Sequence, residues 1–344
     1  MSDILTSFAN LLDGSFLQSG ALWALNTIPG FPPIIQTTHL LAIAVVMGSA
    51  VLLNLRILGL AVPSQDLSEM TNRVMPWLWW ALPVNLISGA FFVFGRPNRY
   101  FSNPVFTSKM GFLILAIALT LVFYLLHRRQ HGYWEQPGKK WPARLLALAS
   151  LGLWLMVVMS GRWIAYLEYL QYPLWSFEVY DAGPQDSFFL AVENWSLSQI
   201  IASTNWFPLL ESFHVIAATL VVGSILWVDL RLLGLAGTRY AFTTLNRELV
   251  PWTWGAFAVA TVTGVGMFIT RASSHLTNPA FQWKLVLLAL AGANMAYFHF
   301  KVYQHIEQWD KEAATPIQLK LAGCLSLLLW SGVMLAGRWV GHIV

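Results

Sequence analysis

The sequence predicts an all-α integral membrane protein with eight transmembrane helices, arranged as two four-helix bundles that form a parallel repeat. Its composition, its long apolar segments and an internal duplication predict this fold. Of the 344 residues, 57% are hydrophobic and only 10% are charged, whereas soluble domains carry about 25% charged residues. The 18 Trp residues are typical of a protein whose aromatic rings lie at both membrane interfaces. We therefore expect the lipid bilayer to be the main surrounding of the chain.

Eight apolar segments are long enough to cross a bilayer, which takes about 20 residues per helix. They fall at residues 34–60, 75–95, 108–127, 143–165, 209–235, 249–270, 283–301 and 319–341. Residues 1–33 are expected to lie at the membrane interface. An outward-facing connecting segment, residues 167–208, joins the four-helix repeats 34–166 and 209–344. Three prolines are expected near the starts of their helices, where proline costs least: Pro76, Pro83 and Pro251.

The two halves repeat one another. Residues 49–60 read SAVLLNLRILGL and residues 224–235 read SILWVDLRLLGL, and a histidine, His39 or His214, lies ten residues upstream of each string. The same offset of 175 residues places Asn103-Pro104 on Asn278-Pro279. Because four helices are an even number, both units cross the membrane in the same sense, which predicts a parallel repeat.

The distribution of cations predicts the orientation. Thirteen of the 20 Lys and Arg residues fall on one side of the predicted helices and seven on the other. The positive-inside rule makes the first side cytoplasmic. We therefore expect a bacterial inner-membrane protein with both termini in the periplasm. Basic loops beside membrane helices explain the pI of 9.2, so no nucleic-acid partner is expected. The single cysteine, Cys324, excludes an internal disulfide framework, a thiolate zinc site and covalent c-type haem attachment.

Each half is expected to gather one histidine and three cations at its outer end. These are His39, Arg96, Lys109 and Arg162 in the first half and His214, Arg271, Lys284 and Arg338 in the second. For any single arginine, extension of the side chain to the lipid headgroups is the alternative. The lysines, however, open apolar segments, where a charge is costly unless it is paired.

This residue set favours b-type haem as the ligand. A neutral imidazole binds the haem iron, Arg and Lys pair with carboxylates such as the two propionates, and helical bundles place cofactors between their helices. Gly48 and Gly223, nine residues after each histidine, permit close approach of either a ring or a neighbouring helix.

The second half carries additional potential metal ligands. His275, His342 and Glu211 replace Tyr100, Tyr166 and Gln36 of the first half. Glu211 and His214 are three residues apart and share a helix face. A copper or zinc site that includes His214, His275 and His342, with His39 as the corresponding ligand in the first half, is therefore an alternative. The other interpretation is that His275 is a loop residue and His342 belongs to a frayed terminus.

The motifs also carry a family resemblance. The pattern is H-x8-G followed by L-R-x-L-G-L, Pro-Trp in the second helix, N-P-x-F-x-x-K opening the third and G-R-W closing the fourth. It resembles an uncharacterised bacterial family of four-helix membrane domains, here duplicated in tandem. More distantly, it is similar to HemJ-type protoporphyrinogen oxidases and CopD-type copper-resistance membrane proteins. The resemblance implies that His39 and His214 match the haem-linked histidine of the HemJ type, and Lys109 and Lys284 its third-helix lysine.

The expected function is membrane electron transfer with one haem b per repeat near the outer face. A periplasmic electron-transfer protein or a quinone would be the partner, and the chain may be one subunit of a larger membrane complex or oxidoreductase. Copper handling of the CopD kind remains open, as does a transporter or a subunit that docks a partner. The scarcity of acidic residues in the apolar segments disfavours transport.

Overall fold

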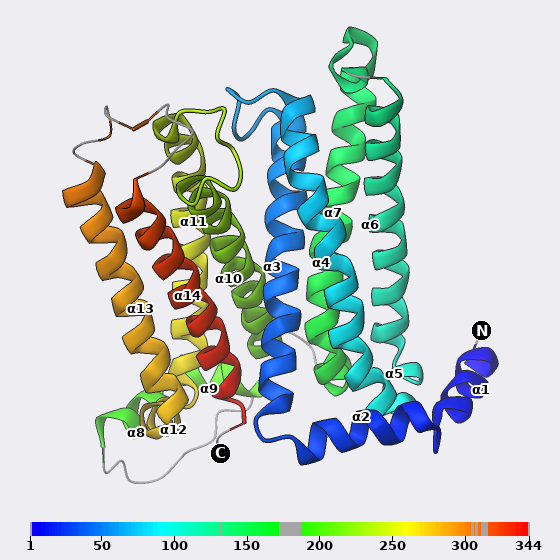
Figure 1. Ribbon diagram of the computed structural model, residues 1–344. Coiled ribbons are helices and arrows are strands. Elements are labelled where there is room, and N and C mark those ends of the chain that lie inside the picture. The colour runs from blue at the N-terminus through cyan, green and yellow to red at the C-terminus, as the bar shows by residue number, and fades with distance from the viewer. Residues whose placement is uncertain are drawn as a thin grey trace.

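The protein is a bundle of long helices that are capable of crossing a membrane (Figure 1). The computed structural model describes residues 2–130, 132–171, 187–303, 306, 309–310 and 316–342, and these ranges contain helices and no strand. Seven helices in them are long and apolar enough to span a bilayer. They are α3 (Phe31–Leu58), α4 (Leu67–Gly95), α6 (Pro104–Arg129), α7 (Lys140–Trp163), α10 (Trp206–Leu232), α11 (Phe242–Ile269) and α14 (Ile317–Trp339). The prediction of a multi-pass all-α membrane protein is confirmed.

The eighth predicted segment forms α13 (Pro279–Tyr297), which packs along α14 (Figure 1). At 19 residues it is the shortest of the long helices, and it contains Lys284 and Asn294. It is not among the seven apolar spans. A short π-helical turn, η4 (Phe298–Val302), continues it. Two 3-10 turns, η1 (Tyr133–Glu135) and η2 (Pro137–Lys139), precede α7.

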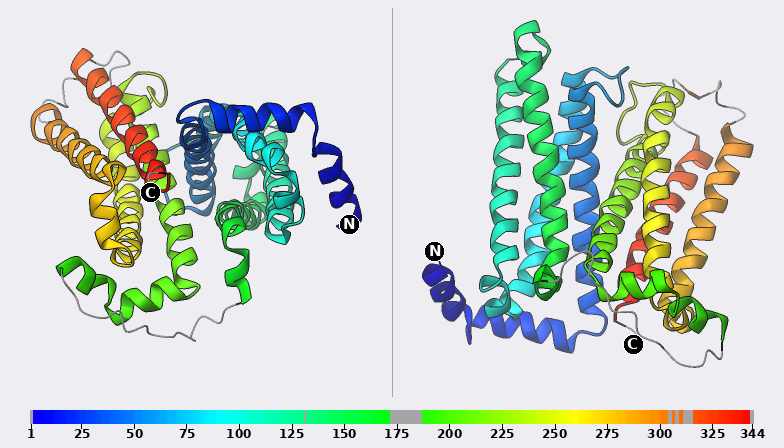
Figure 2. Two further views of the ribbon diagram at one scale, coloured as in Figure 1. Left: turned by 90° about the horizontal axis from the view of Figure 1, so that it is seen from below. Right: turned by 180° about the vertical axis from the view of Figure 1, so that it is seen from behind.

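Short helices gather at the end of the bundle where α3 and α10 begin, here called the histidine end. The opposite end, where α3 and α10 stop after Arg56 and Arg231, is called the arginine end. The short helices are α1 (Ser2–Leu12), α2 (Phe16–Thr27), α5 (Pro97–Phe101), η3 (Ile164–Gln171), α8 (Phe188–Glu193), α9 (Ser196–Ser203) and α12 (Ala272–Thr277). Helices α1 and α2 run across the long helices (Figure 2), and Phe16 is 89% exposed. This arrangement suits the membrane interface predicted for residues 1–33.

The repeat extends upstream of the first long helix in each half. Asp13, just after α1, accepts a hydrogen bond from the Asn98 side chain at 3.3 Å. Glu193, at the end of α8, accepts one from the Ser273 backbone N–H at 2.7 Å. Asn98 and Ser273 are separated by the same 175 residues as the histidines. The folded part of the predicted connecting segment 167–208 is therefore the counterpart of the N-terminal segment. Residues 172–186 lie outside the described part of the chain.

The prolines lie deeper in the helices than predicted. Helix α4 begins at Leu67, after Asp66 accepts a hydrogen bond from the Glu69 N–H, so Pro76 and Pro83 are inside it. Helix α11 begins at Phe242 and likewise encloses Pro251. The prediction that these prolines start their helices was wrong, because the first turns of both helices are polar and do not contribute to an apolar segment. Proline is tolerated inside membrane helices when neighbouring groups satisfy the freed backbone.

Matching Asn-Pro pairs start the third long helix of each half. The Asn103 side chain accepts hydrogen bonds from Val105 and Phe106 N–H, and Asn278 caps α13 in the same way. The following proline occupies the first helical turn, where its missing N–H is not needed. This capping fixes the position of the lysine that follows six residues after each asparagine.

The two halves meet along α3 and α10, which pack against each other; α7 also packs on α10, and α14 on α3. Gly48 and Gly223 face each other at the crossing. A Cβ on Gly48 would lie 2.7 Å from the Gly223 Cα, and a Cβ on Gly223 would lie 2.6 Å from the Ala44 carbonyl oxygen. Of the two predicted uses of these glycines, the structure shows the close approach of neighbouring helices. Trp77 and Trp227 pack edge to face nearby, with ring centroids 6.4 Å apart.

Candidate functional site

His39 lies in the outer third of α3, where its ring contacts α4. Its Nδ1 is 2.9 Å from Ser88 Oγ. The Ser88 hydroxyl donates to the Val84 carbonyl at 2.6 Å, so it accepts the Nδ1 proton of the histidine. The neutral ring then carries its lone pair on Nε2, and no hydrogen-bond partner of this atom lies among the described residues.

His214 is held in the same way in the second half. Its Nδ1 is 2.8 Å from the Ala260 carbonyl oxygen and 3.2 Å from Thr263 Oγ1. A carbonyl oxygen only accepts, so Nδ1 carries the proton and Nε2 again carries the lone pair. Thr263 corresponds to Ser88 at the 175-residue offset. Histidines that bind metals characteristically donate their other ring N–H to a carbonyl or similar acceptor, and both histidines have this arrangement.

A glycine makes room for each ring. A Cβ on Gly89 would lie 3.4 Å from His39 Cε1, and a Cβ on Gly264 would lie 3.1 Å from His214 Cε1. The sequence shows these glycines only as matching positions of the repeat. Their contact with the histidines became apparent only when α3 was packed on α4 and α10 on α11.

The two lysines lie close to the histidines. Lys109 is within electrostatic range of His39, and Lys284 of His214. Each lysine stem packs on the glycine that precedes an arginine: Gly161 for Lys109 and Gly337 for Lys284. Neither ammonium group has a hydrogen bond or ion pair with the described residues. An unpaired ammonium near the start of a membrane helix is costly unless a ligand or water completes its contacts.

The arginines of the G-R-W motifs cross between the halves. Arg162 forms an ion pair with Glu211 of the second half, and Tyr166 donates a hydrogen bond to the same carboxylate. In the reverse direction, Arg338 donates to the side-chain oxygen of Gln36 in the first half. His342 Nε2 lies 3.1 Å from the same oxygen. The structure therefore brings each arginine to the histidine-bearing helix of the opposite repeat.

The remaining predicted residues lie on the surface of the histidine end. Arg96 and Arg271 separate α4 from α5 and α11 from α12. The His275 Nδ1 lies 2.7 Å from the Arg271 carbonyl oxygen, and its ring packs against Phe268 and Phe281. Across the described part of the chain, no group of three or more His, Cys, Asp or Glu side chains is close enough to hold a metal ion.

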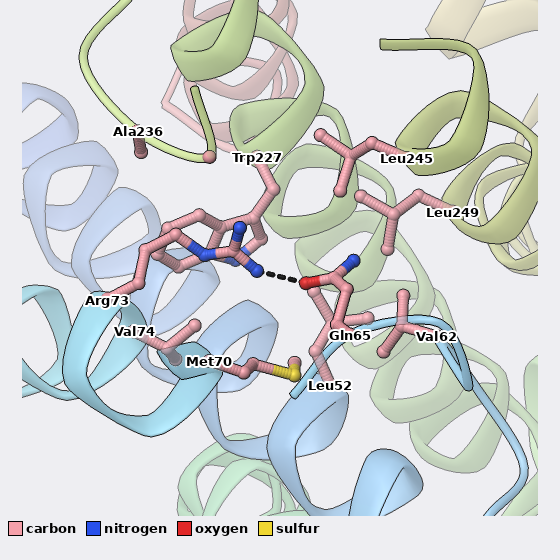
Figure 3. A pocket seen from close by; sticks show the side chains of 11 residues that line it. Leu52, Val62, Gln65, Met70, Arg73, Val74, Trp227, Ala236, Leu245 and Leu249 are labelled. Atoms are coloured by element: carbon pink, nitrogen blue, oxygen red, sulfur yellow. Dashed lines mark hydrogen bonds between the residues drawn. The ribbon is translucent and has the colours of Figure 1, made fainter. Parts of the chain in front are cut away.

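A separate pocket lies between the halves near the arginine end (Figure 3). Its walls are mostly apolar, and Arg73 enters it and donates to the Gln65 side chain. The Nε and Nη1 of Arg73 and the indole nitrogen of Trp227 are buried without hydrogen-bond partners. Arg73 Nη1 is 3.8 Å from the Glu69 carboxylate. This pocket offers hydrogen-bond donors to a small acceptor such as water, at the end opposite to the histidines.

At the arginine end the repeated strings have structural roles. Arg56 donates to the Gln65 carbonyl at 2.7 Å and Arg231 to the Tyr240 carbonyl at 3.1 Å, and Gly59 ends α3 with a φ of 79°. These contacts tie each first helix to the loop that follows.

The comparisons with known proteins agree with the duplication. Residues 27–167 and residues 202–343 each match the same family, described as a family of unknown function, DUF6644. The chain belongs to that family. Two matches in one chain show that it contains two copies of the family's unit. A comparison with curated proteins finds no match.

Proposed function

We propose that each repeat binds one b-type haem at the histidine end, through Nε2 of His39 and Nε2 of His214. The supporting observation is the matched state of the two rings: both give their Nδ1 proton to α4 or α11 and leave Nε2 available. Axial ligation of haem iron needs an imidazole in this form. The resemblance of the histidine and lysine positions to HemJ-type proteins points the same way.

The surroundings of the histidines fit the other parts of the group. Lys109 and Lys284 each offer an unpaired ammonium group to a propionate carboxylate. Gly89 and Gly264 leave the space around the rings free of side chains. A bound haem supplies a one-electron iron couple, and we propose electron transfer with a periplasmic protein or a quinone. The chain's own residues hold the imidazoles in one tautomer and exclude water from them.

The proposal includes the finer topology. We propose that α13 is the eighth span, so that each half is a four-helix bundle in the inner membrane with its histidine end facing the periplasm. A single cysteine introduced at Ser196 should then react with an impermeant maleimide added to intact spheroplasts, in a background without Cys324. A cysteine at Gln136 should react only after the membrane is opened. The reverse pattern would place the histidines on the cytoplasmic side.

Haem content tests the function itself. We expect purified protein to show a Soret band, with His39→Ala and His214→Ala each removing about half the haem and the double variant nearly all of it, because each site depends on its axial bond. His275→Ala is the matched control, because its ring is held by Arg271 and two phenylalanines. Full haem in the double variant would contradict the proposal. A colourless protein that contains copper would favour the copper alternative.

A further inference from the structure

The crossed arginines make the two histidine sites unequal. Gln36 and His39 are three residues apart and share a face of α3. Because Arg338 binds Gln36, the arginine of the second repeat lies beside the histidine of the first. By the same relation, Arg162 lies beside His214, since it pairs with Glu211. Each site is therefore completed by the other half of the chain.

The partner of each arginine differs in charge. The Glu211 carboxylate neutralises Arg162 within the protein. Gln36 offers Arg338 only a neutral oxygen, so the charge of Arg338 is not matched by an ion pair in the described structure. Arg338 is also within electrostatic range of Arg162, which increases the positive potential at this place. One site thus contains its own carboxylate and the other lacks one.

More positive charge surrounds Arg338 from the first half. Tyr100, in α5, is within electrostatic range of Arg99, Arg96 and Arg338. Burial raises the pKa of the Tyr100 phenol, so it stays protonated and can donate a hydrogen bond. None of the three arginines forms an ion pair with an acidic side chain in the described ranges. The corresponding region of the second half has Ser274 and His275 in place of Arg99 and Tyr100.

We infer that Arg338, with Arg96, Arg99 and Tyr100, binds a carboxylate or phosphate group of a ligand at the first histidine site. In the second site the side chain of Glu211 occupies the equivalent place. Two sources of this chemistry exist: a propionate of the haem on His39 and the phosphate of an anionic lipid. The propionate assignment rests on the proposed function, whereas the anion site itself stands on the arginines and Gln36.

The test isolates the first site with His214→Ala and titrates the apoprotein with haemin and with haemin dimethyl ester, whose carboxylates are blocked. We expect haemin to bind about tenfold more tightly or better than the ester, the factor of one charge-assisted hydrogen bond. Arg338→Gln should abolish this preference. Arg162→Gln is the matched control and should leave it, because Arg162 already has Glu211. Gln36→Glu, which keeps the arginine and gives it a carboxylate, should weaken haemin binding as Arg338→Gln does.

A second arm covers the lipid source. In nanodiscs of phosphatidylcholine with a minority of phosphatidylglycerol, native mass spectrometry counts the retained phosphatidylglycerol. If the wild type binds no haemin, the proposed function fails, and the anion site stands only if Arg338→Gln, and not Arg162→Gln, lowers this retention. If haemin binds but its preference over the ester ignores Arg338 or depends equally on Arg162, the inference is overturned while haem binding stands. Loss of both dependences on Arg338 also overturns it.

Discussion

Replacing Gly48 by alanine tests the contact that joins the halves. The new Cβ would lie 2.7 Å from the Cα of Gly223 and 2.9 Å from its carbonyl carbon and oxygen. All three are backbone atoms, so no side-chain rotation relieves the contact. Carbon atoms pack at about 3.5–4.0 Å, and therefore α3 and α10 must separate by about 1 Å to admit the methyl group.

The expected cost follows from a matched control. Gly111 lies inside α6, and a Cβ there meets nothing within 4 Å. Both substitutions gain the same helix propensity, about 0.5–1 kcal/mol, so their difference isolates the packing term. We expect Gly48→Ala to be less stable than Gly111→Ala by about 1–3 kcal/mol, the usual cost of overpacking.

The assay is reversible unfolding of the full chain in mixed micelles, followed by circular dichroism and Trp fluorescence. Gly223→Ala should behave like Gly48→Ala, and the double variant should cost less than the sum, because once the helices have separated the second methyl enters space already opened. Equal stability of the Gly48 and Gly111 variants would refute the close crossing of α3 and α10.

Three further outcomes are expected. Gly264→Ala should perturb the Soret band of its site more than Gly89→Ala, because the new methyl group would lie 3.1 Å rather than 3.4 Å from the histidine ring; equal spectra would count against the seating of the rings. Asp229 is 4% exposed and its Oδ2 has no hydrogen-bond partner, so Asp229→Asn should raise the free energy of unfolding at pH 8 by about 1 kcal/mol, and a loss would give the carboxylate a role. Burial raises the pKa of Tyr100 from 10.0, and burial and Arg338 lower the pKa of His342 from 6.5. Neither group changes charge between about pH 7 and 9, so the haemin-over-ester preference should be constant there; a titration within this range would contradict those assignments.

Much of the site was accessible to sequence reasoning because the chain is written twice. The 175-residue offset singled out His39 and His214 among eight histidines, and it placed Lys109 and Lys284 at the same level. Ser88 and Gly89, which orient the first ring, also repeat as Thr263 and Gly264. Their role was missed, because a serine beside a glycine in an apolar helix carries no signal of its own until the facing helix is known.

The sequence alone determined the helices, the duplication and the end of the bundle at which the histidines lie. Hydropathy and Asn-Pro caps act over a few residues, so they can be read without the fold. Only the tertiary structure decided that Arg162 and Arg338 cross to the opposite repeat. That exchange depends on which faces of α3 and α10 touch, and the touching faces are selected by backbone contact at Gly48 and Gly223. Such contact between residues 175 positions apart leaves no local pattern, because it arises from close packing of two helices rather than from the periodicity of either one.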